Sequence, residues 1–336
     1  MARKTIVTNW IHREVLDRLE TRGAVEANQA RQPWSREELL ARARDADAMV
    51  AFMTDHVDEE FLEQCPDLKV IACALKGADN FDLAACRRRG VAVSIVPDLL
   101  TAPTAELTIG LMIALGRNIV EGDRLVRGGS FTGWRPILYG TGLDGATVGI
   151  IGMGAVGQAI AYRLRAFRCR LLYCDARPLS PGKEDALCLV RRDLSPLLRE
   201  CDYVVLALPL VPDSLHLIDA AALAAMKPGA MLVNPARGSL VNEAAVADAL
   251  EAGTLGGYAA DVFEMEDWAR PDRRCEVEPR LRAHPRTVLT PHLGSAVDSV
   301  RCDIALAAAD DILRFLDGGR MHGTILDPHK SMERTA

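Results

Sequence analysis

Three charged or ionisable side chains, Arg237, Glu266 and His292, each follow a short apolar stretch of the 336-residue chain. Arg237 comes after the run 231–233, Glu266 after "YAADVF", and His292 stands in "LTPHLGS". Such runs predict strands of a buried parallel sheet, and ligands bind beyond the carboxyl ends of these strands. Each residue alone has an ordinary surface interpretation. Together they indicate acid–base chemistry on an anion, because a guanidinium binds anions and a carboxylate favours the protonated form of a neighbouring imidazole.

A glycine-rich turn in the same region predicts dinucleotide binding. Gly152, Gly154 and Gly157 form the pattern G-x-G-x-x-G between a predicted strand, Thr147–Ile151, and a predicted helix, Ala155–Leu164. Glycines let the backbone approach a pyrophosphate, whose charge meets the helix N-terminus and the N–H groups of its first residues. These first residues are Ala155 and Val156.

An acidic residue after the next predicted strand indicates which dinucleotide is bound. Asp175 follows Arg170–Cys174 and lies 18 residues past Gly157, near the roughly 20 expected of the acid that accepts from the adenosine ribose. A carboxylate there repels a 2′-phosphate, so the sequence predicts NAD as the cofactor. Arg177 could partly accommodate that phosphate, and weak use of NADP is therefore expected.

A further cation follows a fourth apolar run. The run 70–75 is followed directly by Lys76 and Gly77. One interpretation is an exposed strand end followed by a turn glycine. The other is that Lys76 supplies a second positive charge for an anion, while Gly77 lets the backbone come close because it has no Cβ.

The overall composition limits the possible partners. With 49% hydrophobic and 26% charged residues, the chain is typical of soluble proteins, and its length suits two domains. A net charge of −6 argues against nucleic acid and anionic membranes as partners. No apolar run approaches the roughly 20 residues of a membrane span, nor does the N-terminus resemble a signal peptide, so a cytoplasmic location is expected. The nine cysteines show no metal-ligand spacing, and no metal is expected.

Alternating strand and helix patterns predict an α/β protein. We expect a doubly wound parallel-sheet (Rossmann) cofactor domain, residues 100–298, inserted into a smaller flavodoxin-like α/β substrate domain, residues 1–99 plus 299–336. Ser35 and Glu38 predict a capping box. The active site is expected in the interdomain cleft, with hinge closure over the substrate. An apolar helix after Pro103 and the aromatic loop around Trp134 suggest a homodimer.

Three motifs of the sequence resemble those of the D-isomer-specific 2-hydroxyacid dehydrogenases. The family pattern N-x-x-R-G-x-x-V is present at 234–241, D-V-x-x-x-E at 261–266 and P-H-x-G at 291–294. By this resemblance Arg237 binds the anionic substrate, Glu266 orients the histidine, and His292 moves the proton.

The resemblance also implies further contacts. Asp261 would hold the nicotinamide end of the cofactor. Additional cofactor contacts would come from Lys76, Thr104, Ala207, Leu208, Pro209, Pro235, Ala236, Arg237 and His292. Beyond Lys76, Gly77, Arg237 and His292, substrate contacts would come from Met53, Trp134, Tyr139, Ser295 and Arg301, although ordinary packing explains the uncharged residues of this set equally well.

Departures from the broad family point to an unusual substrate. The chain has "EDWARPDRRCE" after the glutamate, where a proline-rich segment is usual, and Lys76-Gly77 where ordinary members bind a carboxylate with backbone N–H groups. The segments "CALKGADNFD", "PDLLTAPTAEL", "WRPILYGTGLD" and "GGYAADVFEMEDWAR" are similar to the phosphite-oxidising members of the family. The expected reaction is NAD-dependent oxidation of phosphite, with water as the nucleophile.

Two alternatives remain open at the level of the sequence. The first is a D-2-hydroxyacid dehydrogenase of the glycerate or glyoxylate type. The second is a non-enzymatic NAD-sensing scaffold or corepressor, against which the intact set of Arg237, Glu266 and His292 argues.

Overall fold

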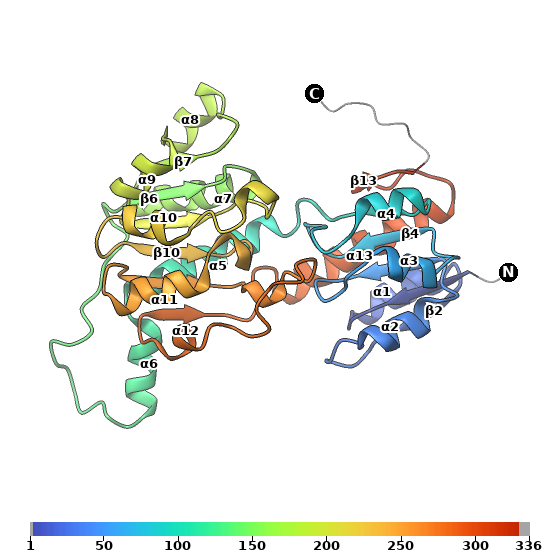
Figure 1. Cartoon of the computed structure of the whole chain (residues 1–336), viewed down its shortest axis with the longest axis horizontal. Helices are drawn as coiled ribbons and strands as arrows, with labels where there is room; N and C mark the ends of the chain where they lie inside the picture. The colour runs from blue at the N-terminus through green and yellow to red at the C-terminus, as the bar shows by residue number, and fades with distance from the viewer. Residues whose placement is uncertain (1–2, 329–336) are drawn as a thin grey trace. The chain divides into compact units, whose positions relative to one another are not determined.

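The computed structural model describes residues 3–328, which form two compact units (Figure 1). Unit 1 comprises the residues up to Leu100, the short segment Trp268–Pro271, and the residues from Ala296 onward. Unit 2 comprises Thr101–Asp267 and Asp272–Ser295. The boundaries that the sequence predicts, after 99 and after 298, lie close to these. The sequence does not predict that Trp268–Pro271 belongs to unit 1, where the Ala269 amide donates to Asn80 Oδ1 at 3.4 Å.

The sheet of unit 1 contains six strands among the described residues, in the order β13-β5-β4-β3-β1-β2. All its neighbouring strands are parallel except β13, which runs antiparallel to β5. The strands are β1 (Lys4–Val7), β2 (Ala24–Ala27), β3 (Ala48–Ala51), β4 (Val70–Cys73), β5 (Ala92–Ser94) and β13 (Thr324–Leu326). The helices are α1 (Arg13–Glu20), α2 (Arg36–Ala43), α3 (Glu59–Gln64), α4 (Leu83–Arg88) and α13 (Asp298–Leu316).

Strand β4 shows why the chain forms a sheet covered on both faces. Ile71 and Cys73 belong to one apolar cluster, together with residues of α2, α3 and α4. Val70 and Ala72 belong to another, together with residues of α1 and α13. Successive side chains of a strand point to opposite faces, so a wholly apolar strand fits only where helices cover both. The capping box is confirmed as well, since Ser35 Oγ accepts from the Glu38 amide at the start of α2.

Unit 2 contains a fully parallel sheet of seven strands, in the order β12-β11-β10-β9-β6-β7-β8 within the described residues. The order reverses at β6, and the crevice at such a reversal is where ligands of open α/β sheets bind. The strands are β6 (Thr147–Ile151), β7 (Arg170–Cys174), β8 (Leu189–Arg191), β9 (Tyr203–Leu206), β10 (Met231–Asn234), β11 (Gly257–Ala260) and β12 (Thr287–Leu289). The helices are α5 (Thr101–Gly116), α6 (Ile119–Arg127), α7 (Ala155–Leu164), α8 (Pro181–Leu187), α9 (Leu194–Glu200), α10 (Ala220–Ala225), α11 (Glu243–Glu251) and α12 (Pro279–Ala283).

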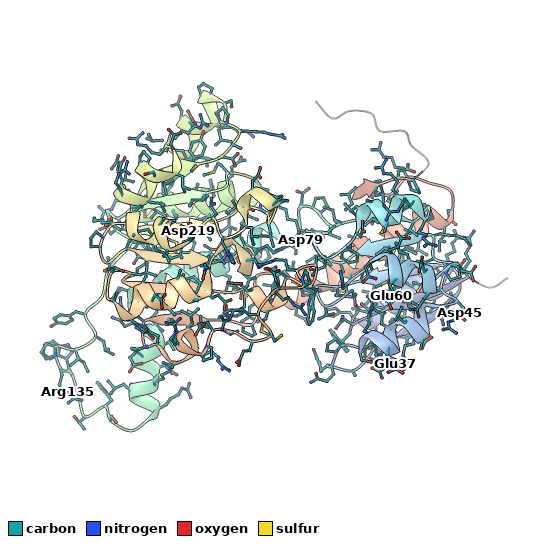
Figure 2. All side chains as sticks on the ribbon, in the orientation of Figure 1. Glu37, Asp45, Glu60, Asp79, Arg135 and Asp219 are labelled. Atoms are coloured by element: carbon teal, nitrogen blue, oxygen red, sulfur yellow. The ribbon has the colours of Figure 1, made fainter. Side chains whose placement is uncertain are left out.

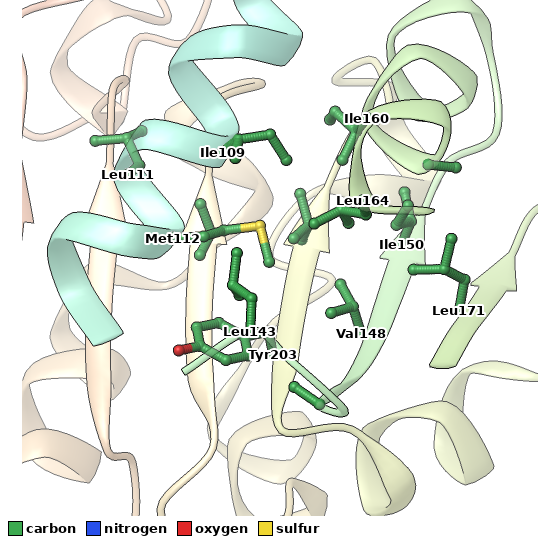
Figure 3. Packing of buried hydrophobic residues seen from close by; sticks show 14 of the residues in the cluster. Ile109, Leu111, Met112, Leu143, Val148, Ile150, Ile160, Leu164, Leu171 and Tyr203 are labelled. Carbon is green, nitrogen blue, oxygen red and sulfur yellow. The ribbon is translucent and has the colours of Figure 1, made fainter. Parts of the chain in front are cut away.

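The apolar helix after Pro103 is a core element of unit 2. Helix α5 lies on the sheet, where Ile109 and Met112 face Val148, Ile150 and Tyr203 in one buried cluster (Figure 3). The predicted α/β fold, with its Rossmann unit, is confirmed. None of the helices within residues 3–328 combines the length and the apolar character that a membrane crossing needs.

A buried carboxylate in unit 1 should make stability depend on pH. Asp55 is 5% exposed and accepts hydrogen bonds from Thr8 Oγ1 at 2.5 Å and from the Phe52 amide at 2.7 Å. Burial raises the pKa of Asp55 from its usual 3.8 to about 6, and these hydrogen bonds offset only part of that effect. Between these two values the folded state binds more protons than the unfolded state, so the free energy of unfolding falls as pH rises.

We therefore expect the free energy of unfolding of Asp55→Asn, relative to the unmodified protein, to grow by about 2 kcal/mol from pH 4.5 to pH 7. Denaturant titrations of both proteins at a series of pH values measure this difference. The exposed Asp67→Asn substitution is the control and should show no such trend. A constant difference between Asp55→Asn and the unmodified protein would contradict the expectation.

Candidate active site

Unit 2 brings an imidazole and a carboxylate together. His292 Nδ1 lies 2.6 Å from Glu266 Oε2. Glu266 ends η4, a short turn (Glu264–Glu266) after β11, and its other oxygen accepts from the Phe263 amide at 2.8 Å. The carboxylate is thus fixed from two sides. With Nδ1 engaged, Nε2 is the ring atom left to exchange a proton with a substrate.

The turn that carries His292 is held by Asp261. His292 has a left-handed backbone, with φ of 57°, which is strained for a residue with a Cβ. Its amide donates to the Asp261 carbonyl at 2.8 Å. Asp261 Oδ1 accepts from Thr290 Oγ1 and the Leu293 amide at 2.5 and 2.7 Å, and Oδ2 accepts from the Gly294 amide at 2.8 Å. Burial raises the pKa of Asp261, although these donors oppose the rise. The carboxylate therefore orients the histidine turn.

Thr104 reaches the same turn from α5. Its Oγ1 donates to the Gly294 carbonyl at 3.3 Å. A Cβ at Gly294 would lie 3.3 Å from both Thr104 Oγ1 and Asp261 Oδ2, so these two atoms converge there. Asp261 itself is 0% exposed, so its carboxylate serves this turn in the structure, and its predicted contact with the nicotinamide end of the cofactor stays a prediction. Ser295, the next residue, is buried.

Arg237 follows β10 in a turn that Asn234 organises. Asn234 Nδ2 donates to the Arg237 carbonyl at 2.8 Å, and Asn234 Oδ1 accepts from the Ala236 amide at 3.1 Å. The Arg237 side chain is half-buried and its Nη1 donates to the Ala236 carbonyl at 2.8 Å. Pro235 and Ala236 after β10, and Ala207, Leu208 and Pro209 after β9, lie past the carboxyl ends of neighbouring strands.

The glycine turn after β6 has the geometry that a dinucleotide requires. Gly152 has φ of 93°, and a Cβ there would lie 2.4 Å from the Ala207 carbonyl oxygen. A Cβ at Gly157 would lie 2.2 Å from the Gly152 carbonyl oxygen. Gly154 instead faces open space, which leaves room for a pyrophosphate at the start of α7. Ala155 and Val156, whose N–H groups begin that helix, are exposed and half-buried.

Asp175 ties the glycine turn to the end of β7. Its Oδ2 accepts from the Met153 amide at 2.6 Å, and its Oδ1 accepts from the Arg177 amide at 2.8 Å. Arg191 Nη2 donates to the Asp175 carbonyl at 3.2 Å. A carboxylate beside the glycine turn fits the ribose of NAD, and weak use of NADP stays a prediction.

Unit 1 gathers two cations at the carboxyl ends of β3 and β4. Lys76 is half-buried, and burial lowers its pKa, while Asp98 partly opposes the change. Arg301, from α13, donates through Nη1 to the Ala74 carbonyl at 3.4 Å, and its guanidinium carbon lies 5.7 Å from the centre of the Phe52 ring. Burial lowers the pKa of Arg301 as well.

Two other predicted substrate residues are also in unit 1. Met53 is half-buried, and its carbonyl accepts from Asn80 Nδ2 at 3.2 Å. Gly77 follows Lys76 in a segment that is half-buried as far as Asn80.

Within one chain, the structure does not bring Trp134 and Tyr139 to the group around His292. Their side chains are 82% and 77% exposed. They lie in the loop after α6, which extends from unit 2 and contains Arg135 (Figures 1 and 2). Asn118 Nδ2 donates to the Tyr139 carbonyl at 3.4 Å, beside the amino ends of the strands. His292 follows a carboxyl end. Within one chain these aromatics therefore lie away from His292, and their predicted role as substrate-lining residues, in their own or a partner subunit, stays a prediction.

Sequence reasoning missed two polar residues of this region. Thr290 binds Asp261, and its position two residues before the histidine was a usable signal. Glu243 is buried against the turn that carries Glu266, and only the fold shows that contact.

Comparisons with known proteins agree with this arrangement. The model of the "D-isomer specific 2-hydroxyacid dehydrogenase, NAD binding domain" matches residues 109–294. A glyoxylate reductase of Pyrococcus furiosus is 36% identical over 323 residues, which is 95% of this chain and 94% of the relative. A glyoxylate reductase of Aeropyrum pernix is 37% identical over 320 residues, 94% of this chain and 93% of the relative.

A solved structure is also similar to this chain in fold and sequence. A Thermus thermophilus protein is similar with a TM-score of 0.86 and 36% identity, covering 96% of this chain and 100% of that chain. The prediction of NAD as cofactor is confirmed by the matched NAD-binding domain. The chain belongs to the D-isomer specific 2-hydroxyacid dehydrogenase family and is an NAD-dependent oxidoreductase.

Proposed function

We propose that this dehydrogenase oxidises phosphite to phosphate. The observation that carries the proposal is the half-buried Lys76, which follows β4 at the carboxyl edge of its sheet and is accompanied there by Arg301. The ordinary members of the family that the sequence resembles bind a carboxylate through backbone N–H groups at this position. An ammonium group at the same place favours an anion with more charge and more acceptor oxygens.

Phosphite near neutral pH is a small, largely doubly charged oxyanion without a carbon skeleton. Its binding free energy must therefore come from charge and hydrogen bonds instead of apolar burial. Lys76 offers three donors, and Arg237 offers a planar set of five. We propose that both contribute to binding this anion and that Arg301 adds to the positive potential.

The chain's own residues would perform the proton transfer. His292, held by Glu266 through Nδ1, would accept a proton from the attacking water at Nε2. Arg237 would orient the anion and compensate the charge on its oxygens. Bound NAD supplies the hydride acceptor. Phosphite, water and NAD⁺ then give phosphate, NADH and one proton, so that the P–H bond is broken and a P–O bond is formed.

A second candidate is the reduction of glyoxylate or the oxidation of glycerate. The observation that favours it is that the relatives found by comparison are named glyoxylate reductases. Arg237, Glu266 and His292 serve this reaction equally well, because it also needs an anion-binding group and a proton-transfer pair. A scaffold without activity has less support, because it would not need the aligned His292 and Glu266.

A substrate panel discriminates between the two reactions. NADH formation is measured with phosphite, glycerate and lactate, and NADH consumption with glyoxylate. The proposal expects kcat/KM for phosphite to exceed that for every organic acid, with NADP used weakly. Rapid turnover of an organic acid without turnover of phosphite would establish the second candidate.

We also propose that the chain forms a homodimer through α6 and the loop that follows it. None of the residues of α6 is buried, and large apolar side chains of α6 and the loop are exposed, among them Ile119 (50%), Val126 (56%) and Ile137 (44%). Apolar patches of this kind mark association surfaces. In such a dimer Trp134 and Tyr139 could contribute to the partner's site.

Ile137→Asp should convert the dimer to a monomer, because it would bury a charge in the contact. Light scattering coupled to size-exclusion chromatography measures the mass. Tyr162→Asp is the control, since Tyr162 is equally an exposed apolar residue of unit 2 (64%) but lies on α7. A wild-type protein that elutes as a monomer would contradict the proposal.

A further inference from the structure

Glu243 is a buried carboxylate that the chemistry above does not use. It is the first residue of α11 and only 1% exposed. Its Oε1 accepts from the Glu264 amide at 2.8 Å and its Oε2 accepts from the Glu278 amide at 3.1 Å. In return, Glu264 Oε1 accepts from the Glu243 amide at 3.0 Å. Glu243 and Glu264 thus bind each other reciprocally, across 21 residues of sequence.

The partner in this exchange is the first residue of the turn that ends in Glu266. Two further contacts hold the same turn. Asp267 Oδ2 accepts from the Ser239 amide at 2.8 Å, and Gly238 packs so closely that a Cβ there would lie 1.9 Å from the Phe263 carbonyl carbon. Gly238 and Ser239 directly follow Arg237. The anion-binding segment and the acid-bearing turn are therefore one hydrogen-bonded assembly.

Local helix capping does not account for Glu243. Asn242 already caps α11, because its side chain accepts from the Ala245 amide at 3.1 Å. The Glu243 carboxylate instead binds two amides of other segments. Burial of the carboxylate is unfavourable in itself. It raises the pKa of Glu243, and the nearby charge of Glu264 raises it further. The two amides and Arg274 oppose this rise. The hydrogen bonds that its two oxygens accept from the Glu264 and Glu278 amides offset this cost of burial.

We propose that Glu243 is a positioning residue, which holds the Glu264–Glu266 turn so that Glu266 stays aligned with His292. The inference rests on the proposed proton-transfer role of that pair. Glu243 touches neither member of the pair, and it would act only through the backbone that carries Glu266. Its effect should therefore appear in turnover and should depend on the presence of the Glu266 carboxylate.

Glu243→Gln tests this proposal at nearly constant side-chain volume. Glutamine has one oxygen and one NH₂ group, so one of the two amides loses its acceptor. We expect kcat to fall about tenfold, while KM and the dissociation constant of NADH change little, because small displacements of catalytic groups act on the chemical step. In the double variant with Glu266→Gln, kcat should be no lower than with Glu266→Gln alone. Multiplicative losses would overturn the inference, since they would show that Glu243 acts independently of Glu266.

Glu251→Gln is the matched control. Glu251 is exposed at the end of the same helix, where it pairs with Arg280 at 3.3 Å, and its loss should leave kcat unchanged. A similar fall of kcat in both variants would mean that any substitution in α11 lowers turnover. That result would overturn the specific role of Glu243.

Amide hydrogen exchange separates this inference from the choice of substrate. In Glu243→Gln, or in Glu243→Asp if the first variant does not fold, peptides covering 262–268 should exchange faster than in the wild type, while β6 and α7 remain protected. Unchanged exchange at 262–268 would overturn the positioning role. A wild-type enzyme without phosphite turnover would overturn the proposed function alone, because the exchange result does not depend on substrate.

Discussion

Replacing His292 with asparagine should lower kcat for phosphite about a thousandfold, with little change in the affinity for NADH. Positioned acid–base groups contribute roughly 10²- to 10⁴-fold to rates, and His292 is the imidazole that Glu266 holds at 2.6 Å. Asparagine tolerates the left-handed backbone of this position better than most residues, so the turn should survive the substitution. Steady-state kinetics measure the loss, and NADH fluorescence measures cofactor binding.

His284→Asn is the control for this prediction. His284 also belongs to unit 2, but its Nδ1 accepts from the Arg286 amide at 3.1 Å, before β12 begins. Its replacement should leave kcat within about twofold of the wild type, as is usual for residues outside a catalytic site. Full turnover by His292→Asn would contradict the proton-transfer role and support a scaffold without catalysis.

Replacing Lys76 with alanine should raise KM for phosphite about a hundredfold and leave NAD binding almost unchanged. A charge-assisted hydrogen bond contributes on the order of 1.5–3 kcal/mol, which corresponds to about 10- to 150-fold in affinity. Lys69→Ala is the matched control, because that exposed lysine precedes the same strand and its ammonium pairs with Asp47 at 2.7 Å. Equal losses for phosphite and NAD would argue against a substrate role for Lys76.

The same lysine should limit binding at alkaline pH. Burial lowers the pKa of Lys76, so its ammonium loses a proton at a lower pH than an exposed lysine would. KM for phosphite should therefore rise as pH increases through the alkaline range. Lys76→Arg should move this rise to higher pH, because a guanidinium stays charged there. An unchanged alkaline profile in Lys76→Arg would mean that another group sets it.

The parts of the fold that local sequence determines were predictable. Strand β6, helix α7 and strand β7 have the predicted bounds, because a glycine turn fixes where one element ends and the next begins. Strand β2 leaves only a weak pattern in the sequence, because it is four residues long and none of its residues is fully buried. The antiparallel β13 and the return of Trp268–Pro271 to unit 1 depend on contacts distant in sequence, and periodicity carries no information on these.

The candidate site shows the same division. The sequence indicated the residue types at 237, 266 and 292, since each follows a recognisable strand. It did not reveal the left-handed backbone of His292, the two amide donors on the Asp261 carboxylate or the contacts of the buried Glu243, because these depend on backbone groups with no sequence signature. It does not show whether Trp134 and Tyr139 act in their own or a partner subunit, because a loop extending from a unit has the same composition as one that covers a site.

The most direct test of phosphite oxidation follows the hydrogen bound to phosphorus. Phosphite carrying deuterium on phosphorus is incubated with the enzyme and NAD, and the reduced cofactor is analysed by mass spectrometry. The account predicts one deuterium in each NADH formed and phosphate as the other product. If the enzyme reduces glyoxylate with NADH but forms no deuterated NADH from labelled phosphite, the account is contradicted.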